Sequence, residues 1–184
     1  MQFDQALGSY IMLLKKWNKS INLVQEKTID VAFNRHVADS LQISDFLEKN
    51  EKIIDIGSGA GFPGMVLALN GFSNITLCEK SFKKSIFLTL VKNKLGVNVK
   101  ISNINIYNVL EKGYTCISRA FGSVLQLLDI MYRLESPKGI LHKGENYFQE
   151  LSEAKKSFNF DYQITNSTTN KQSVILIIRN IRRI

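Results

Sequence analysis

The stretch KIIDIGSGAGFPG, residues 52–64, decides the fold of this chain. A short apolar run that contains Asp55 leads into a turn with three glycines, and a second apolar run, 65–69, follows it. This order predicts a strand, a tight turn and the start of a helix. Pro63 suits the first turn of that helix, because a missing N–H is no loss there. The glycines let the backbone of the turn come close to a bound molecule.

The glycines fit two cofactor motifs. Gly59, Gly61 and Gly64 satisfy G-x-G-x-x-G, the dinucleotide fingerprint, but in that register the first glycine comes late after the strand that contains Asp55. The alternative, Asp55-x-Gly57-x-Gly59-x-Gly61, is the glycine spacing of methyltransferases that use S-adenosylmethionine (SAM). The residues favour SAM over NAD, and a purely structural glycine turn is the third interpretation.

A second acid supports an adenosine cofactor without choosing between SAM and NAD. The predicted strand 75–79 ends in Glu79, 24 residues after Asp55. An acid at the tip of the second strand can accept hydrogen bonds from both ribose hydroxyls of either cofactor.

Length and composition predict one globular domain. The chain has 184 residues, 45% of them hydrophobic, which is enough for a core of its own. We expect residues 1–50 to form a helical extension on a core of residues 51–184. The sequence contains no apolar run of the roughly 20 residues that a membrane span needs, and its start does not resemble a signal peptide. We expect a cytoplasmic monomer.

The chain is basic and poor in cysteine. Its net charge of +8 suggests a polyanionic partner such as a nucleic acid, although Asn, Ile and Lys are all abundant and part of the charge can be compositional drift. Cys78 and Cys116 are too few and too far apart for a disulfide framework or a metal site. We therefore expect no metal.

Two helices are expected in the extension, and strands and helices alternate after it. Apolar residues at three- and four-residue steps predict a helix from Phe3 to about Ile21, and a second helix is expected over 29–47. The strands that we predict are 52–56, 75–79, 97–101, 114–118, 138–142, 158–165 and 173–179. The helices between them are 63–70, 82–95, 106–111, 123–134 and 145–156. This pattern predicts a Rossmann-like α/β fold, with a mostly parallel seven-stranded sheet and an antiparallel edge hairpin.

A polar cluster lies on the second helix of the extension. Arg35 and Asp39 stand four residues apart and can pair, while His36 is also a neighbour of Asp39 and Ser40 follows directly. The cluster is either a substrate surface or a network that locks the extension to the core. Sequence alone leaves both interpretations open.

The tips of the later strands offer further polar groups. Ligands of such sheets bind at the carboxyl ends of the strands. The pair Ile104 and Asn105, then Arg119, then Lys143 follow three successive strands. Arg119 should point into the crevice, where a guanidinium can meet the SAM carboxylate, a phosphate or a guanine edge. Lys143 could act similarly as a point charge, and solvated surface is the alternative for both.

The chain resembles the bacterial small-subunit (16S) ribosomal RNA methyltransferase G family, also called glucose-inhibited division protein B. The matching segments occur in the family's order and extend over nearly the whole chain. They are KWNKSINL (16–23), RHVADS (35–40), DIGSGAGFPG (55–64), SRAF (118–121) and the lysine and glycine at 143–144.

The resemblance implies SAM-dependent methylation of guanine N7 in the decoding-region hairpin of 16S rRNA, within the small ribosomal subunit or an assembly intermediate. Family cofactor contacts fall on Gly57, Phe62, Ile104–Asn105 and Arg119, and Glu79 occupies the ribose position. Asn105 replaces an acid that is frequent in relatives. We expect Arg119 to orient cofactor and base, and the residues that meet RNA to be Arg35, His36, Asp39, Ser40 and Lys143.

The residues agree with chemistry that needs no general base. Guanine N7 has an exposed lone pair and no proton, so the enzyme must align the reactants and remove water. Methylation of a pyrimidine at C5 would require a nucleophilic cysteine, and we interpret Cys116 as a packing residue. The alternatives are a SAM enzyme for a small molecule, an NAD-dependent oxidoreductase and a non-catalytic RNA-binding module.

Overall fold

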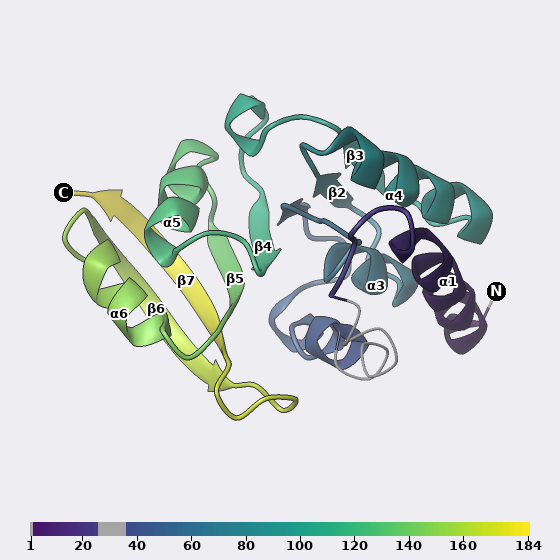
Figure 1. The fold of residues 1–184 in the computed structure, drawn as a ribbon. Helices are drawn as coiled ribbons and strands as arrows, with labels where there is room; N and C mark the ends of the chain where they lie inside the picture. Colours follow the sequence, from purple (N-terminus) through teal and green to yellow (C-terminus); the bar gives the residue numbers. More distant parts are fainter. Residues whose placement is uncertain (1, 26–35) are drawn as a thin grey trace.

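In the computed structural model, seven strands form one sheet in the order β3-β2-β1-β4-β5-β7-β6 (Figure 1). The structure describes residues 2–25 and 36–184. Strands β1 to β5 are parallel, and β7 pairs antiparallel with both β5 and β6. The strands are β1 Ile53–Ile56, β2 Ile75–Cys78, β3 Lys100–Ser102, β4 Thr115–Arg119, β5 Lys138–Lys143, β6 Phe158–Asn166 and β7 Val174–Arg183. The predicted mostly parallel sheet with an antiparallel hairpin at one edge is confirmed.

Helices cover both faces of the sheet (Figure 1). One face is covered by α1 (Phe3–Asn18), α3 (Gly64–Leu69) and α4 (Phe82–Leu95), and the other by α5 (Val124–Arg133) and α6 (Tyr147–Ala154). Because side chains alternate along a strand, Ile53 belongs to the first of these two cores and Ile54 to the second. Both are fully buried.

The N-terminal helix α1 is anchored on the glycine turn. The hydroxyl of Tyr10, a fully buried residue, donates a hydrogen bond to the backbone carbonyl of Ala60. Trp17 packs against Phe87 of α4 with 6.0 Å between ring centroids. The extension therefore forms one wall beside the turn.

The prediction for residues 29–47 is partly wrong. Residues 26–35 lie outside the described part, the helix is seen over 36–41, and a short 3-10 helix, Ser44–Phe46, follows it. The Ser44 hydroxyl donates to the carbonyl of Leu41 at 2.6 Å, so it satisfies a carbonyl that would otherwise continue the helix. Ile43, in the turn between these two helices, is fully buried.

Two predicted elements after α4 are shorter than expected. The strand expected at 97–101 is Lys100–Ser102, because the N–H of Val97 donates to the carbonyl of Lys92 and closes the end of α4 instead. Gly96 supports this ending with φ of +65°. The helix expected at 106–111 is the single 3-10 turn η3, Ile106–Asn108.

Candidate functional site

The glycine turn follows β1 at the place where the strand order reverses. Strands β2 and β4 lie on either side of β1 and run parallel to it, so the chain connections leave in opposite directions there. Such a switch point leaves a crevice at the carboxyl ends of the strands. Gly57 has φ of +70°, and a Cβ on it would lie 2.4 Å from the ring of Phe121. Only glycine fits at this position.

Asp55 supports the turn from below. Its carboxylate is fully buried, and Oδ2 accepts a hydrogen bond from the backbone N–H of Gly64 at 3.0 Å. Burial raises the pKa of Asp55 to about 7, and the hydrogen bond from Gly64 opposes this rise. Asp55 does not line either cavity beside the turn. The structure thus places it where it orients the turn.

Glu79, at the end of β2, is hydrogen-bonded to the glycine turn. Its Oε2 accepts the N–H of Gly59 at 2.9 Å and its Oε1 accepts the N–H of Ser81 at 2.7 Å. Each carboxylate oxygen has further lone pairs. Glu79 also lines a cavity, so it can accept hydrogen bonds from a ligand that carries vicinal hydroxyls.

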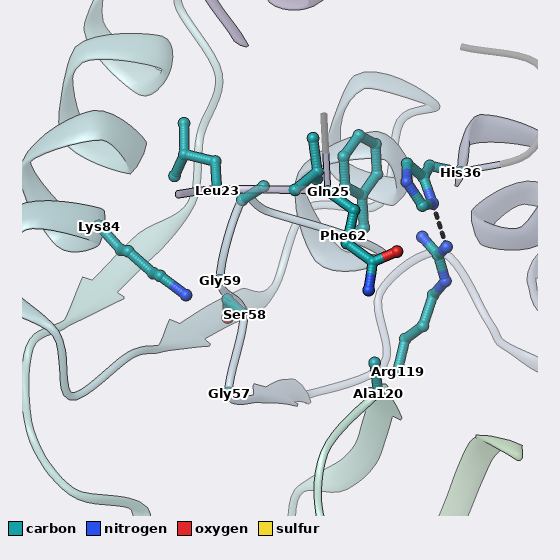
Figure 2. A pocket seen from close by; sticks show the side chains of 12 residues that line it. Leu23, Gln25, His36, Gly57, Ser58, Gly59, Phe62, Lys84, Arg119 and Ala120 are labelled. Atoms are coloured by element: carbon teal, nitrogen blue, oxygen red, sulfur yellow. Dashed lines mark hydrogen bonds between the residues drawn. The ribbon is translucent and has the colours of Figure 1, made fainter. Parts of the chain in front are cut away.

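Two cavities meet at the turn. One has a volume of about 370 Å³ and the other of about 330 Å³. They share four lining residues, Gly57, Gly59, Lys84 and Ala120. In Figure 2, Lys84 reaches toward the first cavity from α4, and Arg119 enters from β4 on the other side. The arrangement suits an elongated ligand that passes over the glycines from one cavity into the other.

The second cavity contains the predicted residues after β3. Ile104 and Asn105 both line it, beside Glu79. The Asn105 side chain accepts the N–H of Tyr107 at 3.2 Å and caps η3, so part of its hydrogen-bonding capacity is used within the chain. The Ile104 side chain is 39% exposed and offers an apolar surface to a planar ligand.

The first cavity contains Arg119, as the sequence predicts. Its guanidinium donates to Nδ1 of His36, lies 3.3 Å from Oδ2 of Asp39 and stands over the ring of Phe62 at 5.8 Å (Figure 2). The ring of His36 is itself 5.1 Å from that of Phe62. The polar cluster predicted on one helix therefore comes together with the tip of β4 and with the glycine turn.

Asp39 also holds the loop between β6 and β7. Its Oδ1 accepts the hydroxyl of Thr169, and Gln42 donates to the same oxygen at 3.2 Å. The amide oxygen of Gln42 in turn accepts the N–H of Thr168 at 2.9 Å. Asp39 is only 6% exposed, so its carboxylate is committed to contacts within the chain. These contacts favour the interpretation of a locking network over that of a substrate surface for Asp39.

Two other predicted RNA contacts point into the protein. The hydroxyl of Ser40, which is fully buried, donates to the carbonyl of His36 at 2.7 Å. Lys143 is 8% exposed; its ammonium lies 2.6 Å from Glu150 and donates to the carbonyl of Gly122 at 2.8 Å. Neither side chain lines the two cavities. Arg35 lies outside the described residues.

Several site residues were not predicted. Lys84 lines both cavities, and Leu23 and Gln25 line the first one. The two lysines directly after Ser81 and Phe82, close to an acid at a strand tip, were an available signal for Lys84. Leu23 ends the segment KWNKSINL that carries the family resemblance, whereas no motif marks Gln25. Asn18 at the end of α1 holds this part of the chain, because its side-chain oxygen accepts the N–H of Leu23 at 2.9 Å.

Other features of the described residues concern the cysteines, possible metal ligands and the length of the helices. Cys116 is fully buried, as predicted for a packing residue, and burial raises the pKa of its thiol to about 12. Over residues 2–25 and 36–184, no three side chains of His, Cys, Asp or Glu come together as a metal site would require. In the same part of the chain, no helix combines the length and the apolar character needed to cross a bilayer.

Solved structures with a similar fold include proteins that bind SAM, which is also written AdoMet. M. jannaschii TYW2 in complex with AdoMet has a TM-score of 0.59 at 15% identity, with 81% of this chain and 76% of that chain covered. The magnesium protoporphyrin IX methyltransferase from Synechocystis PCC 6803 with bound SAM has a TM-score of 0.63 at 11% identity, with 93% and 97% covered. At these identities the likeness shows the fold, which is that of class I SAM-dependent methyltransferases.

Similarity in sequence is more specific. Residues 4–181 match the family described as rRNA small subunit methyltransferase G (GidB). The ribosomal RNA small subunit methyltransferase G of Rickettsia felis is 38% identical over 182 residues, which cover 98% of this chain and 95% of the relative. That of Rickettsia prowazekii is 37% identical with the same coverage. This chain belongs to the rRNA small subunit methyltransferase G family.

Proposed function

We propose that this protein transfers the methyl group of SAM to N7 of a guanine in the decoding-region hairpin of 16S rRNA. The observation that carries the proposal is the pair of cavities that share the glycine turn in a chain of this family. One cavity suits the adenosine of SAM, and the other suits its amino-acid end together with the target base. Gly57 lines both cavities, and a Cβ on it would meet the ring of Phe121.

The adenosine is assigned to the second cavity. Glu79 would accept hydrogen bonds from the ribose hydroxyls with its remaining lone pairs. Ile104 and Asn105 would contact the adenine, the first through its apolar side chain and the second as a neutral hydrogen-bonding group. Gly59, which has a positive φ, lines both cavities and presents no side chain to the ligand. Gly61 also has a positive φ, but a Cβ on it would meet the hydroxyl of Tyr10 inside the protein.

The reacting groups are assigned to the first cavity. Arg119 would orient the carboxylate of SAM and the edge of the guanine, because a guanidinium has several donors in one plane. Phe62 and His36 hold that guanidinium from the side of the extension. Asp55, beneath the turn, would fix its shape and would not touch the ligand.

The proposed reaction needs alignment and no proton transfer before attack. Bound SAM supplies an electrophilic methyl group on a positively charged sulfur. Guanine N7 presents its lone pair without losing a proton, so the tasks of this chain are to hold the base in line and to exclude water. A neutral, buried Cys116 thiol agrees with this, because no covalent adduct to the base is required.

The proposal also includes contacts of His36 and Arg35 with the RNA. Lys143 is given a minor structural role behind the cavity. Lys143 would fix the carbonyl of Gly122 after Arg119 and so act on the site indirectly. It stays a prediction that the protein is a cytoplasmic monomer. It also stays a prediction that its substrate is a partly or fully assembled small-subunit particle.

The test is direct. The protein is incubated with SAM labelled in its methyl group and with small-subunit particles that lack this modification, and the labelled base is mapped. We expect label on one guanine N7 of the 16S rRNA. Label on a free metabolite, binding of NAD in place of SAM, or RNA binding without SAM binding would each support one of the three alternatives instead.

A further inference from the structure

The net positive charge of this chain comes from two segments that contain basic residues and no acidic ones. Residues 5–25 and 80–110 together hold nine of its 24 basic residues and none of its 16 acidic ones. The rest of the chain has 15 basic and 16 acidic residues, so these two segments account for the entire net charge of +8. Uniform compositional drift would not give this distribution.

The two segments lie side by side in the fold. They contain α1 and α4, which lie side by side (Figure 1). The two helices contact each other through the rings of Trp17 and Phe87. The end of α1 leads to residues 23–25 at the first cavity, and α4 begins three residues after Glu79 at the second. Four of the nine lysines, Lys19, Lys80, Lys83 and Lys84, belong to the parts of the two segments that approach the site, whereas Lys92, Lys94 and Lys100 lie farther along the second segment.

Five residues form the rim of the site, and we call this rim the basic bank: Lys19, Lys80, Phe82, Lys83 and Lys84. Lys84 lines both cavities, Lys80 lines the second, and Lys19 lines a hollow that shares residues 23–25 with the first. Phe82 is 69% exposed, between Lys80 and Lys83. Within the described part of the chain, none of the four lysines forms an ion pair, so their charge is not neutralised by a neighbouring carboxylate.

We propose that the basic bank is the surface on which the RNA backbone docks beside the methyl-transfer site, with Phe82 as a stacking platform for an unpaired base. The inference rests on the proposed function and adds where its substrate lies. Unpaired lysines attract phosphates and release counterions from them. An exposed aromatic ring among such lysines is the composition of surfaces that bind single-stranded or looped RNA.

The occupant is RNA because of where the bank lies. A guanine that reaches the first cavity must bring its own phosphates close to Lys84. Lys80, just before α4, and Lys83, in the first turn of α4, extend the positive surface beyond Lys84. A membrane surface would also attract lysines, so vesicles with anionic lipids serve as a competing probe.

The test uses a double variant, Lys19→Gln with Lys83→Gln. Both side chains are exposed and lie at the outer rim. The matched control is Lys155→Gln with Lys156→Gln, two exposed lysines after α6 on the opposite face of the sheet. We expect the bank variant to raise KM for unmethylated small-subunit particles about tenfold, and to lower the slope of log affinity against log salt by about two. The Kd for SAM should not change, and the control should behave like the natural protein.

A second variant separates stacking from charge. Phe82→Ala should weaken particle binding at least fivefold with an unchanged salt slope, whereas Phe82→Tyr should bind normally. Wild-type KM and salt slope in the double variant would overturn the proposal, as would a defect confined to anionic vesicles. Failure of the natural protein to bind SAM or to methylate would instead count against the proposed function, and particle binding measured by sedimentation would still test the bank.

Discussion

Replacing Glu79 by Gln should weaken SAM binding while the protein stays folded. The substitution keeps the shape of the side chain, but the carboxylate holds the N–H groups of Gly59 and Ser81 with one oxygen each. An amide has only one oxygen, so its NH₂ group must face one of these two donors. The turn then loses a contact, and the ribose loses an ionised acceptor.

The magnitude follows from the number of bonds affected. A hydrogen bond to a charged group contributes about 1.5–3 kcal/mol, so losing one such bond to the ligand should raise the Kd for SAM roughly 10- to 150-fold. The buried contact with Gly59 should lower the melting temperature by only a few degrees, since the neutral amide still holds one of the two N–H groups.

The assay is calorimetric titration with SAM and with its demethylated product. Glu48→Gln is the matched control, because Glu48 is an exposed acid in the loop before β1. This loop lies at the end of β1 opposite to the glycine turn. The control should bind both ligands normally. If folded Glu79→Gln protein bound SAM with the wild-type Kd, the assignment of the ribose to the second cavity would be wrong.

Four further changes test the site. Burial raises the pKa of Asp55 from 3.8 to about 7, so between these pH values the folded chain keeps a proton that the unfolded chain has lost. The free energy of unfolding should therefore fall by roughly 1.4 kcal/mol per pH unit as the pH rises through this range. In denaturant titrations, the Asp55→Asn variant should show a weaker dependence of stability on pH. Arg119→Lys should keep the fold but lower kcat at least tenfold in the methylation assay, and a normal rate would refute its orienting role. Gly64→Ala should destabilise the protein by about 1–3 kcal/mol in urea unfolding, because its Cβ would lie 2.4 Å from a leucine methyl, whereas Gly144→Ala meets nothing within 4 Å and should be neutral. Tyr10→Phe should cost about 1–3 kcal/mol of stability, seen as a lower urea midpoint, because it leaves a buried carbonyl of the turn without its donor.

The alternation of strands and helices was predictable because each element has a strong local signal. The glycine turn, the acid at the tip of β2 and Arg119 at the tip of β4 were predictable for the same reason, since parallel strands bring their carboxyl ends to one edge. The start of β3 was not, because Val97 is apolar and β-branched yet its N–H is used to end α4. Local preference cannot show which of two competing hydrogen bonds a residue makes.

The tertiary part of the site lay beyond such patterns. Spacing on one helix indicates that His36 and Asp39 are neighbours, but nothing local says that Arg119 and Thr169 complete the group. The same holds for Lys143, whose position after a strand suggested a ligand contact, while its ammonium is turned toward Glu150. Burial decides these cases, and burial depends on the whole fold.

The contact between Asp39 and Thr169 has a consequence for biosynthesis. Thr169 lies 130 residues after Asp39, and β7, which lies between β5 and β6 in the sheet, follows both of them in the sequence. A nascent chain can therefore form the glycine turn early, yet the Asp39 carboxylate beside Arg119 gains its partner Thr169 only after 130 further residues have been synthesised. The order of synthesis therefore delays the last contact of Asp39 until the loop between β6 and β7 has been made.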